Sequence, residues 1–303
     1  GTGTHINNEG FEWEVIEGTS NPIHLQATNG VVNGGKFTAG PSVYGYFIRQ
    51  YYTELKNVEI TTYNASALFS YFATLRNSKV YGYLLNATNT TLIYQNAGGL
   101  VLDGNYVYLE GPTAGTRNNV TNLGTIFTFN DFQIKEANGV TCDSSIGNNI
   151  FVNDGEYALN VSDEVVGGNI DISGGQGLIT VNEGTSGVRV TGLNIRVKDY
   201  LGPAAQVGTN TSLMGCNFFD DYGQADTDII QVKTGCTGVE VANCTFDFFN
   251  ATDIAGSDIL GAAGTANSLL NLFKSGTSAA SGLFGGGSGE SKGFVAPANK
   301  ALS

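Results

Sequence analysis

The sequence predicts an all-β fold in which short strands stack on one another as a solenoid. A short apolar run bounded by Asn or Gly returns along the chain at intervals of roughly 18 to 28 residues, a range in which repeats indicate solenoids. Each run is only about four residues long, too short to bury an apolar face alone, so stacking must supply the core. Gly accounts for 43 of the 303 residues, which suits sharp corners. The runs cover residues 57–60, 77–80, 99–105, 149–153, 169–172, 187–192 and 238–243.

The N-terminal segment, residues 1–29, is predicted to cap the solenoid. Phe11, Trp13 and Val15 alternate with Glu12 and Glu14, the period-two pattern of a half-buried strand. The first coil of a solenoid exposes apolar side chains and unpaired backbone groups, which a cap must cover.

The repeat proper is predicted over residues 30–254, which follow one another without a linker. We expect roughly eight to ten coils, each adding one layer to a continuous core. The apolar residues expected to be buried in these strands are Val58, Ile60, Val188, Val190, Val239 and Val241.

Residues 255–303 differ in character and are predicted to serve in assembly. Between residues 257 and 274 the apolar residues follow the i, i+3, i+4, i+7 spacing of an amphipathic helix. Two internal glycines weaken such a helix, so it requires a surface to dock on. The Gly- and Ser-rich stretch that follows is typical of a flexible linker. The residues of the predicted assembly helix are Ile259, Ala266, Leu269, Leu270 and Phe273.

The charge and the short apolar runs of the chain make a nucleic-acid partner, a membrane span and a signal peptide unexpected. The chain has 14 basic and 27 acidic residues and a formal net charge of −13. It lacks the Lys and Arg clusters that neutralise phosphates, so we expect no nucleic-acid surface. Its apolar runs are far shorter than the about 20 residues that a membrane span needs. A basic start followed by an apolar stretch is absent, so a signal peptide is not expected.

The four cysteines, Cys142, Cys216, Cys236 and Cys244, do not have the spacing of a metal site. Cys216 and Cys244 occupy matching places in two repeat units, which favours stacked small residues inside the coil. A disulfide between Cys236 and Cys244 is the alternative. We expect neither a metal nor another cofactor.

Carboxylates on a long polar loop are the strongest candidates for catalysis. Glycoside hydrolysis needs two carboxylates placed for acid and base work, and Asp220 and Asp221 form such a pair in sequence. The histidines, His5 and His24, lie far away near the start, and no basic partner accompanies the pair. A solvated loop is therefore the favoured interpretation, and we expect no hydrolase or lyase activity.

Tyrosines form the second candidate site. Tyr81 and Tyr83 precede Tyr106 and Tyr108 by 25 residues, the length of one coil. Strand alternation places all four side chains on the outer surface. Outward tyrosines can stack on sugar rings and hydrogen-bond through their hydroxyls. They can equally pack against a neighbouring subunit, or form a ladder without a partner.

The strand and corner phrases together, for example Val188 and Val190 or Val239 and Val241 with their Asn or Gly corners, resemble the right-handed parallel β-helix superfamily, the pectin-lyase-like fold. This resemblance covers residues from about 30 to 250. An acidic coil rich in Gly, Asn and Thr looks most similar to the tail spikes and tail fibres of bacteriophages. The opening stretch of many such spikes, Asp-Phe-Gly-Ala followed by Gly-Asp-Gly-x-x-Asp, is not present in residues 1–25.

The resemblance implies a single-stranded right-handed β-helix, a homotrimer, contacts with other virion proteins and binding to host surface polysaccharide. We therefore expect a structural virion protein that acts in attachment or assembly without catalysis. The alternatives are a polysaccharide-degrading β-helix enzyme and a secreted bacterial adhesin. Oligomeric state and glycan turnover distinguish these classes.

Overall fold

The computed structural model describes residues 5–7, 12–15, 25–113, 117–175, 179–181, 187–198, 204–220, 230–232, 236–248, 258–262, 266–269, 272–273, 282–284 and 291–292. Two units divide the chain, residues 1–155 and residues 156–303. All described residues in regular structure are in strands, and the strands pair in parallel within each unit. No helix long and apolar enough to cross a membrane occurs in this part of the chain.

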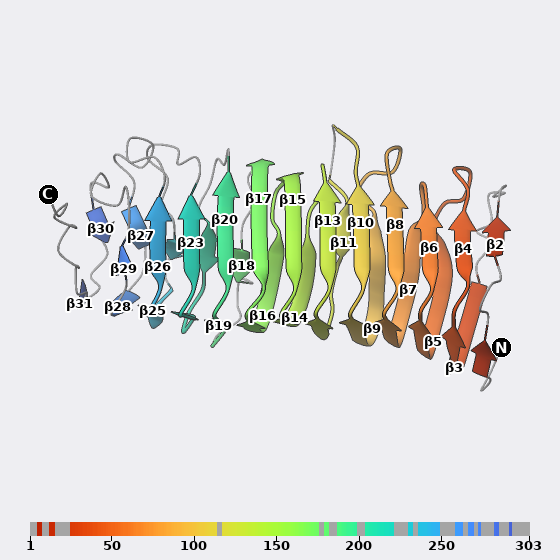
Figure 1. The fold of residues 1–303 in the computed structure, drawn as a ribbon, viewed down its shortest axis with the longest axis horizontal. Coiled ribbons are helices and arrows are strands. Elements are labelled where there is room, and N and C mark those ends of the chain that lie inside the picture. The colour runs from red at the N-terminus through yellow and green to blue at the C-terminus, as the bar shows by residue number, and fades with distance from the viewer. Residues whose placement is uncertain are drawn as a thin grey trace, which may run out of the picture. The chain divides into compact units, whose positions relative to one another are not determined.

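Unit 1 contains two parallel ladders, whose strands all run the same way within each ladder (Figure 1). The first ladder runs β1, β3, β5, β7 and β9, after which β11 and β12 both pair with β9, and β14 pairs with β12. The second runs β2, β4, β6, β8, β10, β13 and β15. The strands are β1 His5–Asn7, β2 Glu12–Val15, β3 Leu25–Asn33, β4 Lys36–Ala39, β5 Tyr46–Lys56, β6 Glu59–Thr62, β7 Ser66–Arg76, β8 Lys79–Tyr83, β9 Thr91–Asp103, β10 Tyr106–Glu110, β11 Asn119–Thr121, β12 Ile126–Thr128, β13 Asp131–Lys135, β14 Val140–Ile146 and β15 Asn149–Gly155.

Unit 2 repeats this plan with shorter strands. The first half of β16 pairs with β18, and this column of parallel strands continues through β21, β24, β27 and β30. The second half of β16 pairs with β19, and a second column continues through β22, β25, β28 and β31. A third column runs β17, β20, β23, β26 and β29. The strands are β16 Leu159–Val166, β17 Asn169–Gly175, β18 Ile179–Val181, β19 Arg189–Thr191, β20 Asn194–Lys198, β21 Ala205–Val207, β22 Ser212–Met214, β23 Asn217–Asp220, β24 Ile230–Val232, β25 Val239–Ala242, β26 Thr245–Phe248, β27 Asp258–Ala262, β28 Ala266–Leu269, β29 Leu272–Phe273, β30 Gly282–Phe284 and β31 Ser291–Lys292.

The fold is therefore the all-β parallel solenoid that the sequence predicts. Within the described residues, the ladder from β2 to β15 contributes one strand from each of seven successive coils in unit 1, and the column from β17 to β29 one from each of five in unit 2. The register pairs Asp131 with Asn149 and Ile230 with Leu260, so one coil takes as few as 18 residues and another as many as 30. Strands of consecutive coils keep their register although the connections between them vary in length, since variation is confined to the loops.

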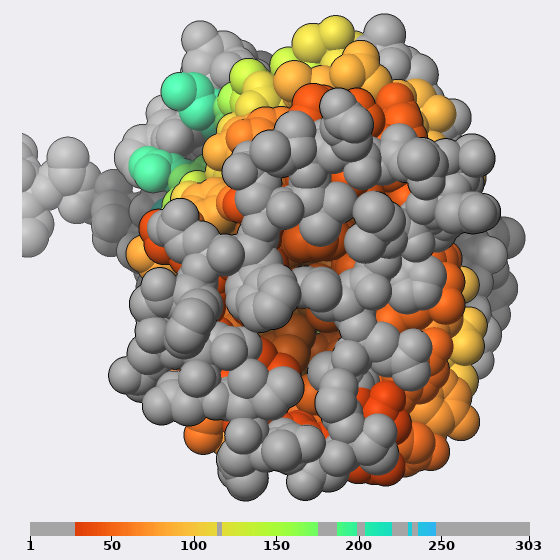
Figure 2. All heavy atoms as spheres, turned by 90° about the vertical axis from the view of Figure 1, so that its right-hand side faces the viewer, coloured from red at the N-terminus to blue at the C-terminus, as the bar shows by residue number. Residues whose placement is uncertain are grey.

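Alternation along the strands builds the core. All six apolar residues predicted to be buried are at most 2% exposed: Val58, Ile60, Val188, Val190, Val239 and Val241. In unit 2 the rings of Phe218 and Phe246 stack inside the coil, with centroids 5.0 Å apart and planes 5° from parallel. Because each inward side chain lies over its equivalent in the next coil, the core is continuous along each unit. In the end view of Figure 2 the red, orange and yellow residues of successive coils lie behind one another.

Asn or Gly occupies most of the corners, as the sequence predicts, although Phe129 occupies one of them with a φ of 53°. Asn57 and Asn77 begin matching turns with φ values of 54° and 48°, and Gly104 occupies the next such corner with a φ of 65°. The N–H of each donates to a carbonyl of the following coil, for example Asn77 to Asp103 at 2.9 Å. Gly and Asn enter this left-handed region at lower cost than other residues.

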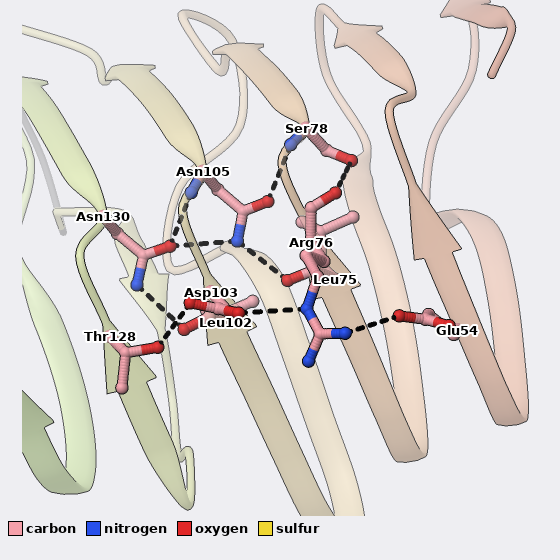
Figure 3. A network of polar contacts seen from close by, with 9 residues as sticks. All are labelled: Glu54, Leu75, Arg76, Ser78, Leu102, Asp103, Asn105, Thr128 and Asn130. Carbon is pink, nitrogen blue, oxygen red and sulfur yellow. Dashed lines mark hydrogen bonds and ion pairs between the residues drawn. The ribbon is translucent and has the colours of Figure 1, made fainter. Parts of the chain in front are cut away.

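A ladder of buried asparagines runs inside unit 1 just after these corners (Figure 3). The Oδ1 of Asn130 accepts from the main-chain N–H and from the Nδ2 of Asn105, both at 2.9 Å. The Nδ2 of Asn130 donates to the Leu102 carbonyl at 3.0 Å and to the Oδ1 of Asn148 at 2.9 Å. The Oδ1 of Asn105 accepts from the N–H of Ser78 at 2.9 Å. The ladder thus satisfies corner backbone groups that would otherwise be buried without partners.

An ion-pair row crosses the outside of the same strands (Figure 3). The Arg76 guanidinium contacts Glu54 Oε1 at 3.1 Å and Asp103 Oδ2 at 3.0 Å. The hydroxyl of Thr128 donates to Asp103 Oδ1 at 2.7 Å. Arg76 is partly exposed, so these ion pairs contribute little to the free energy of folding. They do fix the orientation of the side chains of Glu54, Arg76, Asp103 and Thr128.

At the N-terminus the described part of residues 1–29 forms a paired rung. β1 pairs with β3, and β2 pairs with β4 in a register that places Trp13 beside Phe37. The strand predicted from the Phe11 to Val15 alternation is confirmed as β2.

The helix expected between residues 257 and 274 is not found in the described part of that segment, which forms strands. Ile259 lies in β27, Ala266 and Leu269 lie in β28, and Phe273 lies in β29, whereas Leu270 is outside the described residues. Parallel pairing with β24, β25 and β26 therefore continues beyond residue 254. The physical reason is that the segment's glycines disfavour a helix, while the preceding strands offer open backbone groups for pairing.

Candidate binding surface

The tyrosine row lies on the outer face of β8 and β10, where alternation leaves Val80, Val107 and Leu109 inside. The register differs by two residues from the 25-residue spacing, because Tyr108 pairs with Tyr81. The rings nevertheless meet diagonally: Tyr81 contacts Tyr106 with centroids 5.8 Å apart, and Tyr83 contacts Tyr108 at 5.5 Å. The four predicted residues Tyr81, Tyr83, Tyr106 and Tyr108 are thus brought together.

The tyrosine row extends to Tyr63, which the spacing of the other four tyrosines does not predict. Its ring stacks on Tyr83 with centroids 5.5 Å apart and planes 22° from parallel. Tyr63 directly follows the last residue of β6 and lies in a bend, so strand alternation does not reveal its direction. Its position just after a strand, 20 residues before Tyr83, is the signal that could have found it.

One end of the tyrosine row carries a fixed polar group. The Tyr108 hydroxyl donates to Glu110 Oε2 at 2.9 Å, and Lys135 Nζ donates to Glu110 Oε1 at 2.7 Å. Burial, together with the hydrogen bond to Glu110, raises the pKa of Tyr108 to about 12. The hydrogen bond from Lys135 holds the pKa of Glu110 below its ordinary value. Near neutral pH the phenol is therefore a donor and the carboxylate is ionised.

A larger set of rings, which was not predicted from the sequence, covers the outer side of β5, β7 and β9. This aromatic face contains Tyr46, Tyr51, Tyr52, Phe69, Tyr71, Phe72 and Tyr94. The rings form one connected set: Phe69 contacts Tyr46 at 4.7 Å and stacks on Tyr94 at 5.7 Å between centroids. The signal in the sequence is the doublet Tyr51-Tyr52 followed 20 residues later by Tyr71-Phe72.

Two rings of this face lie at a strained bend. Tyr52 and Phe72 have φ values of 51° and 47°, a region that bulky residues rarely enter. Their rings stack with centroids 5.3 Å apart and planes 9° from parallel, and they remain 53% and 47% exposed. The next coil has Gly98 at this bend, and a Cβ there would come within 2.5 Å of the Phe72 ring. Backbone strain that holds exposed aromatic rings in place is a feature that points to function.

Arg49 is the cation of the aromatic face. Its guanidinium carbon lies 5.6 Å from the centroid of the Phe69 ring. Its Nε is buried and has no hydrogen-bond partner. The ion pairs found among the described residues do not include Arg49.

The other predicted sites have less support in the described residues. Asp220 ends β23, in register with Val197 and Phe248, and Asp221 lies outside the described residues. No group of three or more His, Cys, Asp or Glu side chains that could hold a metal ion occurs in the part of the chain that was described.

The cysteines lie as the favoured interpretation expects. Cys216 and Cys244 are fully buried, and the register of the strands that follow them places them in consecutive coils. All four cysteines are free thiols, so the Cys236–Cys244 disulfide is not formed.

No family model matches the sequence, and no curated protein or solved structure matches it either.

Proposed function

We propose that this chain is a structural protein of a bacteriophage particle, a tail fibre, tail spike or related surface component, that attaches to the host surface without catalysis. The observation that carries the proposal is the concentration of outward rings in unit 1, in the tyrosine row and the aromatic face. Backbone pairing on both sides holds most of these rings, so little conformational freedom remains to be lost when a ligand binds.

A polysaccharide suits this arrangement of rings. Neighbouring strands lie about 4.8 Å apart, so successive coils present rings at short, regular intervals. Aromatic faces pack on the C–H faces of pyranoses, and tyrosine hydroxyls can hydrogen-bond to sugar hydroxyls. An extended glycan crossing several coils would contact many weak sites at once, which raises its affinity.

Assembly into a homotrimer that contacts other virion proteins is part of the same proposal, with residues 255–303 contributing to it. Among the described residues, β30 pairs only with β27, and β31 pairs only with β28. A strand with an open edge can pair with another chain. This supports an assembly role for the segment without the helix that the sequence predicted.

The test combines glycan binding, glycan turnover and oligomer mass in one preparation. Purified full-length protein is incubated with capsular polysaccharides and lipopolysaccharides, and we expect retention of a glycan without new reducing ends or unsaturated sugars. Light scattering should give the mass of a homotrimer. The physical reason for the absence of turnover is that Asp220 and Asp221 have no histidine or basic partner nearby in the sequence.

Turnover that Asp221→Asn abolishes and Asp143→Asn leaves intact would instead make the chain a polysaccharide-degrading enzyme. Asp143 lies in β14 of unit 1 and serves as the matched carboxylate control. A monomer that binds glycan without turnover would favour the secreted adhesin.

A further inference from the structure

Two cysteines of unit 2 lie one above the other inside the coil. Cys216 and Cys244 are fully buried, and each directly precedes a strand of the column that contains β23 and β26. Asn217 pairs with Thr245, so the two cysteines are neighbours across consecutive coils. The thiol of Cys244 hydrogen-bonds to the Cys216 side chain, so the two sulfurs are in contact.

The same position in unit 1 holds the asparagine ladder. Asn130 directly precedes β13, and its Nδ2 donates to the Leu102 carbonyl of the preceding coil. The Cys216 thiol reaches the Val190 carbonyl of its own preceding coil in the same way, at 3.7 Å. A thiol is a weaker donor than an amide, so hydrogen bonding to the backbone does not explain cysteine at this position. What two stacked cysteines add is the capacity to bond to each other.

The distance between neighbouring strands suits a disulfide. Hydrogen-bonded strands lie about 4.8 Å apart, within the Cα separation of about 4.4–6.8 Å that disulfides span. Bond formation then requires only a small approach of the two Cβ atoms. Cys236 is less well placed, because β25 separates it from Cys244, and the four extended residues of that strand alone span about 10 Å.

The hydrogen bond between the two thiols gives them different roles. It comes from the Cys244 thiol and lowers the pKa of Cys216, and the same bond raises the pKa of Cys244. The thiolate is the nucleophile in thiol–disulfide exchange. Cys216 is therefore the attacking sulfur, and Cys244 is the sulfur that resolves the intermediate.

We propose that Cys216 and Cys244 form a reversible disulfide that ties two successive coils of unit 2 together, with a small-molecule disulfide such as oxidised glutathione as the oxidant. This redox pair is independent of the proposed attachment function. Because both sulfurs are buried, the exchange takes place when the coils open.

The reaction proceeds in two exchanges. The Cys216 thiolate attacks one sulfur of oxidised glutathione, so a mixed disulfide forms and one glutathione thiolate leaves. Cys244 then gives up its proton and its sulfur attacks Cys216, which forms the Cys216–Cys244 bond and releases the second glutathione. Two protein thiols are oxidised, one glutathione disulfide is reduced to two glutathione thiols, and these take up the two protons.

The experiment follows the thiols of the full-length chain. One sample is incubated with oxidised glutathione and a matched sample with reduced glutathione, both in mild denaturant that opens the coils transiently and is then removed. Each sample is then fully unfolded and alkylated. We expect alkylation of all four cysteines in the reduced sample and of two in the oxidised sample.

Peptide mapping identifies the linked pair. Trypsin and glutamyl endopeptidase together cut after Lys233 and Glu240, which places Cys216, Cys236 and Cys244 in three different peptides. We expect a link between the Cys216 and Cys244 peptides. Unit 2 of the oxidised chain should unfold at a temperature about 5–10 °C higher, since the bond closes a loop in the unfolded chain. Dithiothreitol should remove both the link and the shift.

Two variants test the assignment. Cys216→Ala should abolish the link and the temperature shift, whereas Cys236→Ala removes the other thiol of unit 2 and should leave both unchanged. The peptide map of the wild-type chain does not depend on how either variant folds.

Alkylation of all four cysteines after oxidation, a link through Cys236, or a link between two chains would overturn the redox pair. A Cys216–Cys244 link that leaves the unfolding temperature unchanged would overturn the tie between coils. Neither result bears on glycan attachment, which is measured separately.

Discussion

Replacing Asn130 with Ala is expected to lower the free energy of unfolding of unit 1 by about 3–5 kcal/mol, because several buried polar groups lose their partners together. The main-chain N–H of Asn105, the carbonyl of Leu102 and the Oδ1 of Asn148 all bond to the Asn130 side chain. All are buried between coils, so water cannot take over these hydrogen bonds. Chemical denaturation followed by far-ultraviolet circular dichroism measures the change.

Asn153→Ala is the matched control. Asn153 lies in β15 of the same unit with its side chain exposed, so its loss should change stability by no more than about 0.5 kcal/mol. Equal effects of the two substitutions would mean that the asparagine ladder does not hold the coils together.

Gly111→Ala is expected to lower the free energy of unfolding of unit 1 by about 2–4 kcal/mol through overpacking. A Cβ at Gly111 would lie 2.4 Å from the main-chain oxygen of Glu136 and 3.3 Å from the Cβ of Ala137. Backbone of the neighbouring coil cannot move aside without breaking its own pairing, so the strain is shared by both coils. The same denaturation experiment provides the measurement.

Gly167→Ala provides the comparison, because a Cβ there would meet nothing within 4 Å. The φ of Gly167 is 60°, so its substitution carries only the left-handed backbone cost of about 1 kcal/mol. If Gly111→Ala is no more destabilising than Gly167→Ala, the claim that two coils pack too closely at Gly111 to admit a Cβ is wrong.

The strands and their inward residues could be predicted from the sequence because the same local pattern, alternating apolar residues between Asn or Gly corners, recurs in successive coils. Val188 and Val190 or Val239 and Val241 alternate between Asn or Gly corners, and this pattern determines both which side chains are buried and where the chain turns. The outward direction of Tyr81 and Tyr108 followed from the same alternation.

The features that could not be predicted from the sequence, the tyrosine register and the stacking of Tyr52 on Phe72, depend on contacts between successive coils. The tyrosine register differs by two residues because coil length varies, and spacing along the chain does not fix pairing between coils. Tyr52 and Phe72 occupy a bend where sequence rules expect Gly or Asn, so their stacking was not visible from residue type.

The C-terminal strands were missed for a related reason. Ile259, Ala266 and Leu269 satisfy helical spacing, yet short apolar runs broken by glycines satisfy strand patterns equally well. The preceding coil decides between them, because it offers a parallel edge in register. Local propensity gives way to this tertiary pairing.

The central claim is that the outward rings of unit 1 attach the protein to a surface glycan, and the most direct measurement compares ring-deleted variants in equilibrium binding. Wild-type protein, Tyr81→Ser/Tyr106→Ser, Tyr51→Ser/Tyr71→Ser and the control Tyr44→Ser are titrated with the glycan that wild type retains. Tyr44 is exposed and has no ring contact among the described residues.

At least one double variant should lose about tenfold or more in affinity while Tyr44→Ser retains it, since removing well-placed rings costs over 1 kcal/mol. Unchanged affinity in both double variants, with folding intact by circular dichroism, would contradict the account.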